Sequence, residues 1–166
     1  MSHHNPWDVR DPAAMITESL RRARARPGDV LVAILDRGDS PEQSTHDVVR
    51  VNRGSLPQRH EASEVLREHA VRLAGHREWI ESRWEPPRWL LATIICREGR
   101  VIPGPYELFW LMAWRYSNHH TRAFDGDVYL VTQHGWTGYL DRRSGFEPGL
   151  HATGRPLSVV PRAGDQ

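Results

Sequence analysis

Lysine is absent from this sequence, because all of its 22 basic residues are arginine. The absence excludes every mechanism that needs a lysine amine, such as Schiff-base catalysis and the phosphate-binding lysine of P-loop enzymes and kinases. A compositional bias toward arginine explains the pattern most simply. Selection against lysine-directed modification is the alternative, and arginine also makes stronger bidentate and stacked contacts.

Cysteine and long apolar runs are scarce as well. The single cysteine, Cys96, excludes an internal disulfide framework and suits a reducing compartment, so we expect a cytoplasmic protein. The sequence has no apolar run of about eighteen residues, so we expect no transmembrane helix and no membrane partner. Its first residues also lack the basic and apolar regions of a secretory signal.

The charge of the chain is nearly balanced, with a formal net charge of +1 and a pI near 8.1. A nucleic-acid-binding protein usually has a strong basic excess or a basic face, so balance leaves only a local patch for that role. Hydrophobic residues make up 39% of the 166 positions, which is enough for one domain with a core. We predict a single α+β domain over 11–150, a flexible N-terminus over 1–10 and an irregular tail over 151–166.

Apolar periodicity predicts three helices and four to five strands. The helices are expected over 11–26, from Ser55 to about Trp84, and over 105–120. The strands are expected over 29–36, 47–51, 89–96 and 126–133, with a brief fifth one at 101–103. Strands 29–36 and 47–51 are expected to form a hairpin, and strand 89–96 to lie centrally because it is apolar almost throughout. The order of these elements predicts one mixed sheet packed with helices.

The third predicted helix is apolar nearly all round, so it must be covered on more than one side. Either the domain itself encloses the helix, or part of it is a surface for a partner. Tryptophan and arginine are the residues that most often anchor protein interfaces. The candidate interface residues are the aromatic ones on one face, Tyr106, Phe109, Trp110 and Trp114.

The segment "NHHTRAFDGD" that follows this helix holds the densest group of reactive side chains. The candidate catalytic residues are His119, His120, Asp125 and Asp127, with Asp36 at the end of an earlier strand. His120, Asp125 and Asp127 are the set that would hold a divalent ion and activate water for phosphodiester hydrolysis. The alternative is structural, because histidines suit a helix C-terminus and Asp-Gly suits the bend before a strand.

Four arginines crowd the end of the first predicted helix: Arg21, Arg22, Arg24 and Arg26. Cations are favoured at a helix C-terminus, which gives them a structural explanation. A docking patch for an acidic partner or for a phosphate group is the alternative, and a nucleic acid would then bind with a strong salt dependence.

The sequence completes no catalytic constellation and implies no cofactor. The hypothesis it favours is an accessory or regulatory domain that binds another protein or associates with itself into a homo-oligomer. A small metal-dependent hydrolase acting on a phosphodiester or nucleotide is the first alternative, and nucleic-acid binding through the arginine patch is the second. The sequence leaves open whether the protein is an enzyme.

Overall fold

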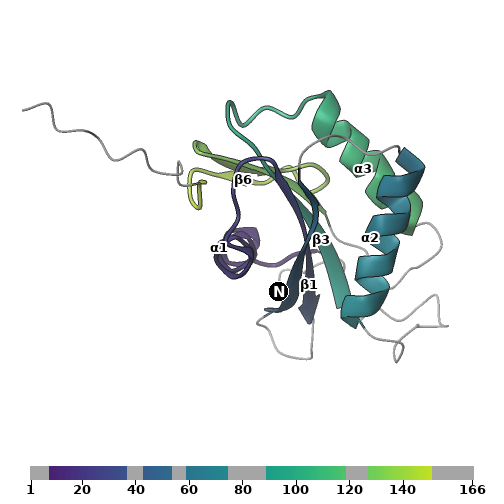
Figure 1. The fold of residues 1–166 in the computed structure, drawn as a ribbon. Coiled ribbons are helices and arrows are strands. Elements are labelled where there is room, and N and C mark those ends of the chain that lie inside the picture. Colours follow the sequence, from purple (N-terminus) through teal and green to yellow (C-terminus); the bar gives the residue numbers. More distant parts are fainter. Residues whose placement is uncertain (1–7, 37–42, 54–58, 75–88, 119–126, 151–166) are drawn as a thin grey trace, which may run out of the picture.

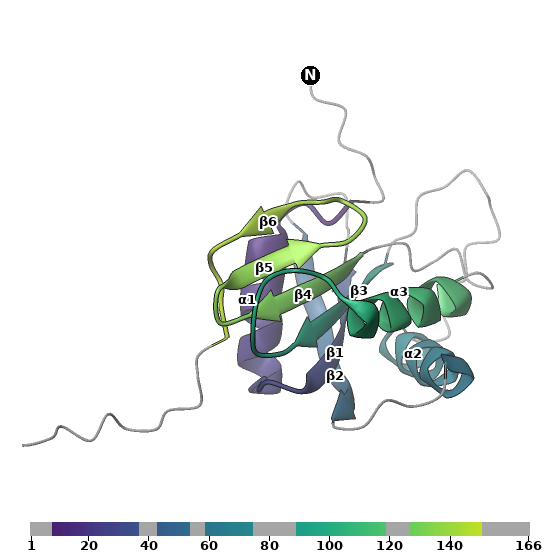
Figure 2. The same cartoon turned by 90° about the horizontal axis from the view of Figure 1, so that it is seen from above.

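One six-stranded mixed sheet lies between two helical layers in the computed structural model, which describes residues 8–36, 43–53, 59–74, 89–118 and 127–150. The helix α1 covers one face of the sheet, and α2 and α3 cover the other (Figures 1 and 2). The elements are α1 (Pro12–Ala23), β1 (Asp29–Asp36), β2 (Ser44–Arg53), α2 (Arg59–Ala74), β3 (Trp89–Cys96), α3 (Pro105–Asn118), β4 (Val128–Thr132), β5 (Gly135–Gly138) and β6 (Ser144–Gly145). The predicted α+β class and three helices are confirmed, with six strands where four to five were expected.

The strand order is β2-β1-β3-β4-β5-β6, so β1 and β3 lie inside the sheet. β1 pairs antiparallel with β2, which confirms the predicted hairpin, and antiparallel with β3. β3 pairs in parallel with β4 and is buried along its whole length, as its continuous apolar sequence predicted. The helix α3 makes the crossover between these two parallel strands.

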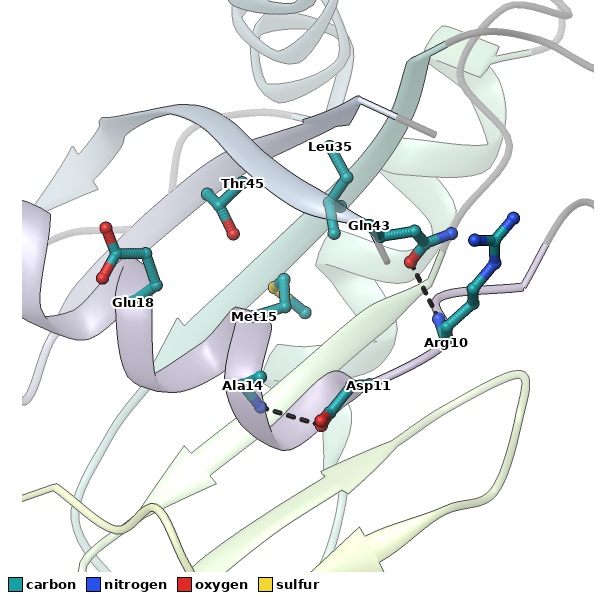
Figure 3. A pocket seen from close by; sticks show the side chains of 8 residues that line it. All are labelled: Arg10, Asp11, Ala14, Met15, Glu18, Leu35, Gln43 and Thr45. Carbon is teal, nitrogen blue, oxygen red and sulfur yellow. Dashed lines mark hydrogen bonds between the residues drawn. The ribbon is translucent and has the colours of Figure 1, made fainter. Parts of the chain in front are cut away.

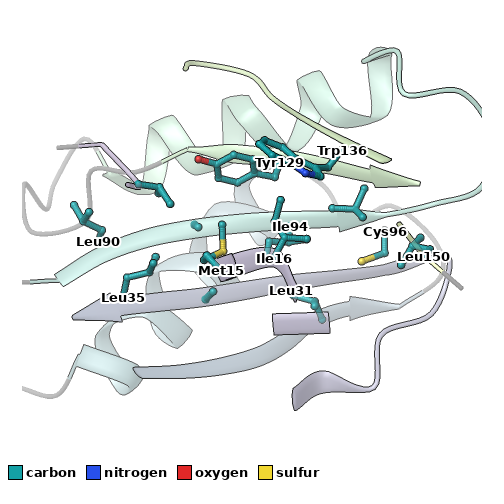
Figure 4. Close-up of a cluster of buried hydrophobic side chains, with 14 residues drawn as sticks. Met15, Ile16, Leu31, Leu35, Leu90, Ile94, Cys96, Tyr129, Trp136 and Leu150 are labelled. Atoms are coloured by element: carbon teal, nitrogen blue, oxygen red, sulfur yellow. The ribbon is translucent and has the colours of Figure 1, made fainter. Parts of the chain in front are cut away.

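Two apolar cores form because successive side chains of a strand point to opposite faces of the sheet. On the α2 and α3 side, Val32 and Leu91 pack with Leu66 and Trp110. The other core lies between the sheet and α1 and joins side chains from β1, β3, β4 and β5 to the helix (Figure 4). Its members include Met15, Ile16, Leu31, Leu35, Leu90, Ile94, Tyr129 and Trp136.

β5 and β6 occupy the glycine-rich segment after β4, where no strands were predicted. Glycine interrupts the alternation of apolar and polar residues by which a strand is predicted, yet here it permits the pairing of β5 with β6. A Cβ atom on Gly135 would lie 2.1 Å from the carbonyl oxygen of Gly145, and one on Gly145 would lie 2.7 Å from Nε1 of Trp136. The strands therefore approach each other at a distance that only glycine allows.

α1 begins where its sequence predicts, but it ends at Ala23, before the predicted end at Arg26. Asp11 accepts a hydrogen bond from the Ala14 amide at 2.9 Å, and Pro12 occupies the first turn. Arg24 ends the helix in the left-handed conformation, with φ of 48°. α2 confirms the second predicted helix over 59–74, whereas its predicted start at Ser55 and its extension to Trp84 lie outside the described residues.

The brief strand expected at 101–103 is wrong, because these residues form part of a loop between β3 and α3. The Arg97 guanidinium organises this loop in place of a strand pairing. It donates to the carbonyl oxygens of Glu98 at 3.0 Å, Arg100 at 3.2 Å and Ile102 at 2.8 Å. The loop and the connection between α1 and β1 lie at the same end of the sheet, where Gly28 donates its amide proton to the Cys96 carbonyl (Figure 1).

Candidate interaction surface

Asp127 is the only member of the predicted metal set that the structure describes, since His120 and Asp125, like the catalytic candidate His119, lie outside the described residues. Its side chain is 3% exposed and accepts backbone hydrogen bonds from Val128 at 2.7 Å, Leu140 at 2.8 Å and Asp141 at 3.0 Å. Burial raises the pKa of this carboxyl to about 6, against the opposing effect of the three amide donors. The carboxylate thus anchors the loop that follows β5.

Asp36, the further catalytic candidate, does not approach Asp127. It ends β1 opposite Trp89, whereas the Asp127 carbonyl accepts the Thr93 amide, four positions further along β3. At roughly 3.3 Å per strand residue, the two aspartates are separated by about 13 Å along the sheet alone. Among the described residues, no three His, Cys, Asp or Glu side chains are placed to share a metal ion.

A second polar cluster surrounds Asp141, next to Asp127. The Tyr129 hydroxyl donates to Asp141 at 3.0 Å, and Nε of Arg143 donates to it at 2.8 Å. The same guanidinium donates to the carbonyl oxygens of Val9 and Arg10, so it ties the N-terminal segment to the loop between β5 and β6. These groups satisfy one another, which gives the cluster a structural role.

The four arginines near the end of α1 do not form one free patch. Glu18 accepts from Arg21 at 2.7 Å and from Arg22 at 2.5 Å, and these guanidiniums lower the pKa of Glu18 to about 2. Arg22 also donates to the His46 carbonyl on β2 at 2.9 Å. Arg24 and Arg26 remain exposed beyond the helix. Two of the four arginines, Arg21 and Arg22, therefore form ion pairs within α1, and Arg22 also links the helix to the sheet.

A cavity of about 500 Å³ opens beside the first turns of α1 (Figure 3). It is lined by Arg10, Asp11, Ala14, Met15, Glu18, Leu35, Gln43 and Thr45. Its polar groups serve the fold: Asp11 caps α1, Glu18 binds two arginines, and the Gln43 side chain accepts from the Arg10 amide at 2.8 Å and donates to the Asp8 carbonyl at 3.0 Å. Each charged side chain that lines the cavity already has a partner within the chain, so the cavity offers a ligand no unpaired charge.

The aromatic interface candidates on α3 face the core. Trp110 is fully buried and Trp114 is 4% exposed, both in the cluster between the sheet and α2. Tyr106 and Phe109 are partly buried against the same cluster. These rings fix α3 to the domain, and they leave the aliphatic side of the helix to solvent.

Large apolar side chains are exposed on α3 and on the loop before it: Leu108 and Met112, at 51% and 41%, and Ile102, at 61%; we call these three the α3 surface. Leu108 and Met112 are one helical turn apart and therefore adjacent. Arg97 links the loop to the helix, because it donates to the Ile102 carbonyl at 2.8 Å and, at 2.5 Å, to the buried carboxylate of Glu107. The sequence places Leu108 and Met112 on an apolar side of the predicted helix, but the interface candidates that it indicates are the aromatic residues of another side.

Glu107 fixes the start of α3 and hence the position of this surface. It is 1% exposed, and its second carboxylate oxygen accepts from the Gly104 amide at 2.7 Å, one half of a capping box. The Tyr139 hydroxyl reaches the Gly104 carbonyl at 3.5 Å. An ion pair, a cap and a loop contact thus converge on the segment that presents Ile102 and Leu108.

No family model, curated protein or solved structure matches this chain. Its function must therefore be inferred from its own residues and their geometry.

No helix in the described part of the chain is long and apolar enough to cross a membrane. Cys96 is 1% exposed, and burial raises the pKa of its thiol to about 12, so it is a core residue that does not supply a thiolate at neutral pH.

Proposed function

We propose that this protein is an accessory domain that binds another protein through the α3 surface. The observation that supports the proposal is the exposure of Leu108 and Met112 on adjacent turns of α3 and of Ile102 on the loop before it, a segment held in place by Arg97 and Glu107. Protein interfaces combine an apolar centre with a polar rim, and methionine and arginine are enriched in them. A contiguous apolar patch exposed on a folded domain marks such a site, and Leu108 and Met112 are adjacent on α3.

The hydrolase alternative receives no comparable support from the described residues. Asp127 is buried with three amide donors on its oxygens, and Asp36 lies apart from it in the register of the sheet. A carboxylate needs free lone pairs directed to a shared point in order to coordinate a metal. Binding is therefore the function that the geometry favours.

Site-specific photocrosslinking tests the proposal. A benzophenone amino acid replaces Met112 in the full-length protein, and a control protein carries it in place of Phe146, which is 91% exposed after the edge strand β6. On irradiation in the source cells, we expect discrete covalent adducts from position 112 that are absent from position 146. Molecular mass in solution, measured across concentration, then shows whether such an adduct contains a second copy of the chain.

Equal adducts from both positions would indicate unspecific contact and would contradict the proposal. The proposal also fails if position 112 yields no adduct while the purified protein stays monomeric at every concentration. The two label positions are matched, because each replaces an exposed apolar side chain whose removal costs little packing.

A further inference from the structure

We propose that the partner of the α3 surface is an acidic amphipathic segment of another protein, a proposal that rests on the function proposed above. Its basis is the charge around the apolar side chains. Leu108, Met112 and Arg115 follow one another at helical spacings of four and three, so they form one stripe, and Arg115 is exposed at its end. Arg100 is exposed as well, on the loop before α3 that carries Ile102.

Few acidic side chains of α3 and of the loop before it reach solvent, whereas the neighbouring helix α2 exposes Glu61 and Glu68. The side chains of 105–115 that reach solvent, fully or in part, are those of Pro105, Tyr106, Leu108, Phe109, Met112 and Arg115. Glu107 is buried and paired with Arg97. Glu98 is the single exposed acid of the loop over 97–104, and it lies beside Arg100. A ligand on the stripe therefore meets apolar groups and the Arg115 guanidinium, and Arg100 lies on the loop before the helix.

The spacing suits an amphipathic segment. The Cα atoms of Leu108 and Arg115 are about 10 Å apart on the helix axis, at 1.5 Å per residue. A partner helix of a few turns would place apolar residues on Leu108 and Met112 and carboxylates beside Arg100 and Arg115. Guanidinium groups bind carboxylates through bidentate, charge-assisted hydrogen bonds, which favours an acidic partner over a neutral one.

A second copy of the chain fits less well. A two-fold contact is self-complementary, so each α3 would meet another α3. The stripe itself carries Arg115 and no exposed acid, so a second stripe would offer Arg115 no carboxylate, and like charges across an interface oppose association. A nucleic acid would engage the arginines yet leave Ile102, Leu108 and Met112 without apolar partners.

Three synthetic peptides of about 16 residues, long enough for four helical turns, test the partner class with the full-length protein. The first carries leucines at helical spacing among glutamates, the second has arginine in place of each glutamate, and the third has serine in place of each leucine. Fluorescence anisotropy gives each dissociation constant in low and in high salt. We expect the first peptide to bind roughly ten times more tightly than either of the others, and more weakly as salt rises.

Variants link the binding to the stripe. Arg100→Gln with Arg115→Gln should weaken binding of the first peptide roughly three- to tenfold and reduce its salt dependence. Leu108→Ser with Met112→Ser should weaken it at least as much. Two matched controls should leave it unchanged: Arg21→Gln on α1, which covers the opposite face of the sheet, and Phe146→Ser.

The outcomes separate the partner class from the surface itself. If the arginine peptide or the serine peptide binds as well as the first, the acidic amphipathic partner is refuted, whereas the docking surface remains open to the crosslinking test. If no peptide binds and position 112 yields covalent dimers, the partner is a second copy, and only the further inference is lost. If no peptide binds and position 112 yields no adduct, both proposals fall.

Discussion

The two partners of the ion pair between Arg97 and Glu107 should differ in how much their replacement destabilises the protein. Replacing Arg97 should lower the free energy of unfolding more than replacing Glu107. Glu107 is 1% exposed, whereas the Arg97 side chain is 28% exposed. Replacing Arg97 with methionine keeps the apolar stem of the side chain but leaves a buried carboxylate without its cation. Replacing Glu107 with glutamine leaves a guanidinium that water reaches and that keeps its three carbonyl acceptors.

The magnitudes follow from these environments. Loss of one partner from a fully buried pair costs about 3–5 kcal/mol, and the partial exposure of Arg97 reduces this to about 2–4 kcal/mol for Arg97→Met. Glu107→Gln preserves an oxygen that accepts the Gly104 amide, so it should cost about 1–2 kcal/mol. In the double variant, the neutral amide at position 107 needs no cation as a partner. The loss of unfolding free energy in this variant should therefore be smaller than the sum of the two single losses by about 1–2 kcal/mol.

Urea unfolding of the four proteins, followed by tryptophan fluorescence, measures these free energies by linear extrapolation. Equal costs for the two single variants, or strict additivity in the double variant, would refute the reasoning about burial. Because Arg97 also binds the Ile102 carbonyl, Arg97→Met should in addition weaken whatever binds to the α3 surface. Glu107→Gln, which leaves this bond in place, is the matched comparison.

Three further predictions concern other sites. The folded-state pKa of Asp127, about 6, lies above its ordinary value near 4, so its contribution to stability is present at low pH and is lost as the pH rises through 6. Relative to the Asp127→Asn variant, the free energy of unfolding should fall by up to about 3 kcal/mol between pH 4 and pH 7. Parallel pH profiles of the two proteins would contradict this. Cys96 should react with iodoacetamide at pH 8 only after denaturation, as mass spectrometry would show, and fast modification of the folded protein would disprove its burial. Gly145→Ala places a Cβ atom 2.7 Å from Nε1 of Trp136, so it should destabilise the protein by about 1–3 kcal/mol in the same urea assay, and a neutral effect would mean that the indole moves freely.

Much of the fold could be predicted because local patterns and tertiary structure agree. The apolar run of β3 required burial on both faces and hence a central position, which the sheet confirms. Asp11 and Pro12 mark the start of α1. β5 and β6 could not be found in this way. Their glycines break the alternation of apolar and polar residues, and the reason for the glycines is contact between strands that the sequence does not display.

The candidate site could be predicted only in part. Periodicity indicates that α3 is apolar on several sides, but the sheet and α2 decide which side is covered. The large flat rings of Trp110 and Trp114 fill the space against the sheet, and the aliphatic stripe is left outside. For the aspartates, sequence spacing cannot show that three backbone amides already occupy Asp127, since two of them come from residues on the far side of β5.

The exposure of Leu108 and Met112 is a consequence of where Glu107 must lie. Its carboxylate is needed inside, to accept the Gly104 amide and to hold the Arg97 guanidinium, so the rotation of the first turn of α3 is determined by a buried polar contact. With Glu107 and Trp110 directed inward, the helical spacing turns positions 108 and 112 toward solvent. Leucine and methionine at those positions each expose apolar area that a polar residue would not. The fold gains nothing from this exposure, whereas a bound apolar segment between Arg100 and Arg115 would bury it.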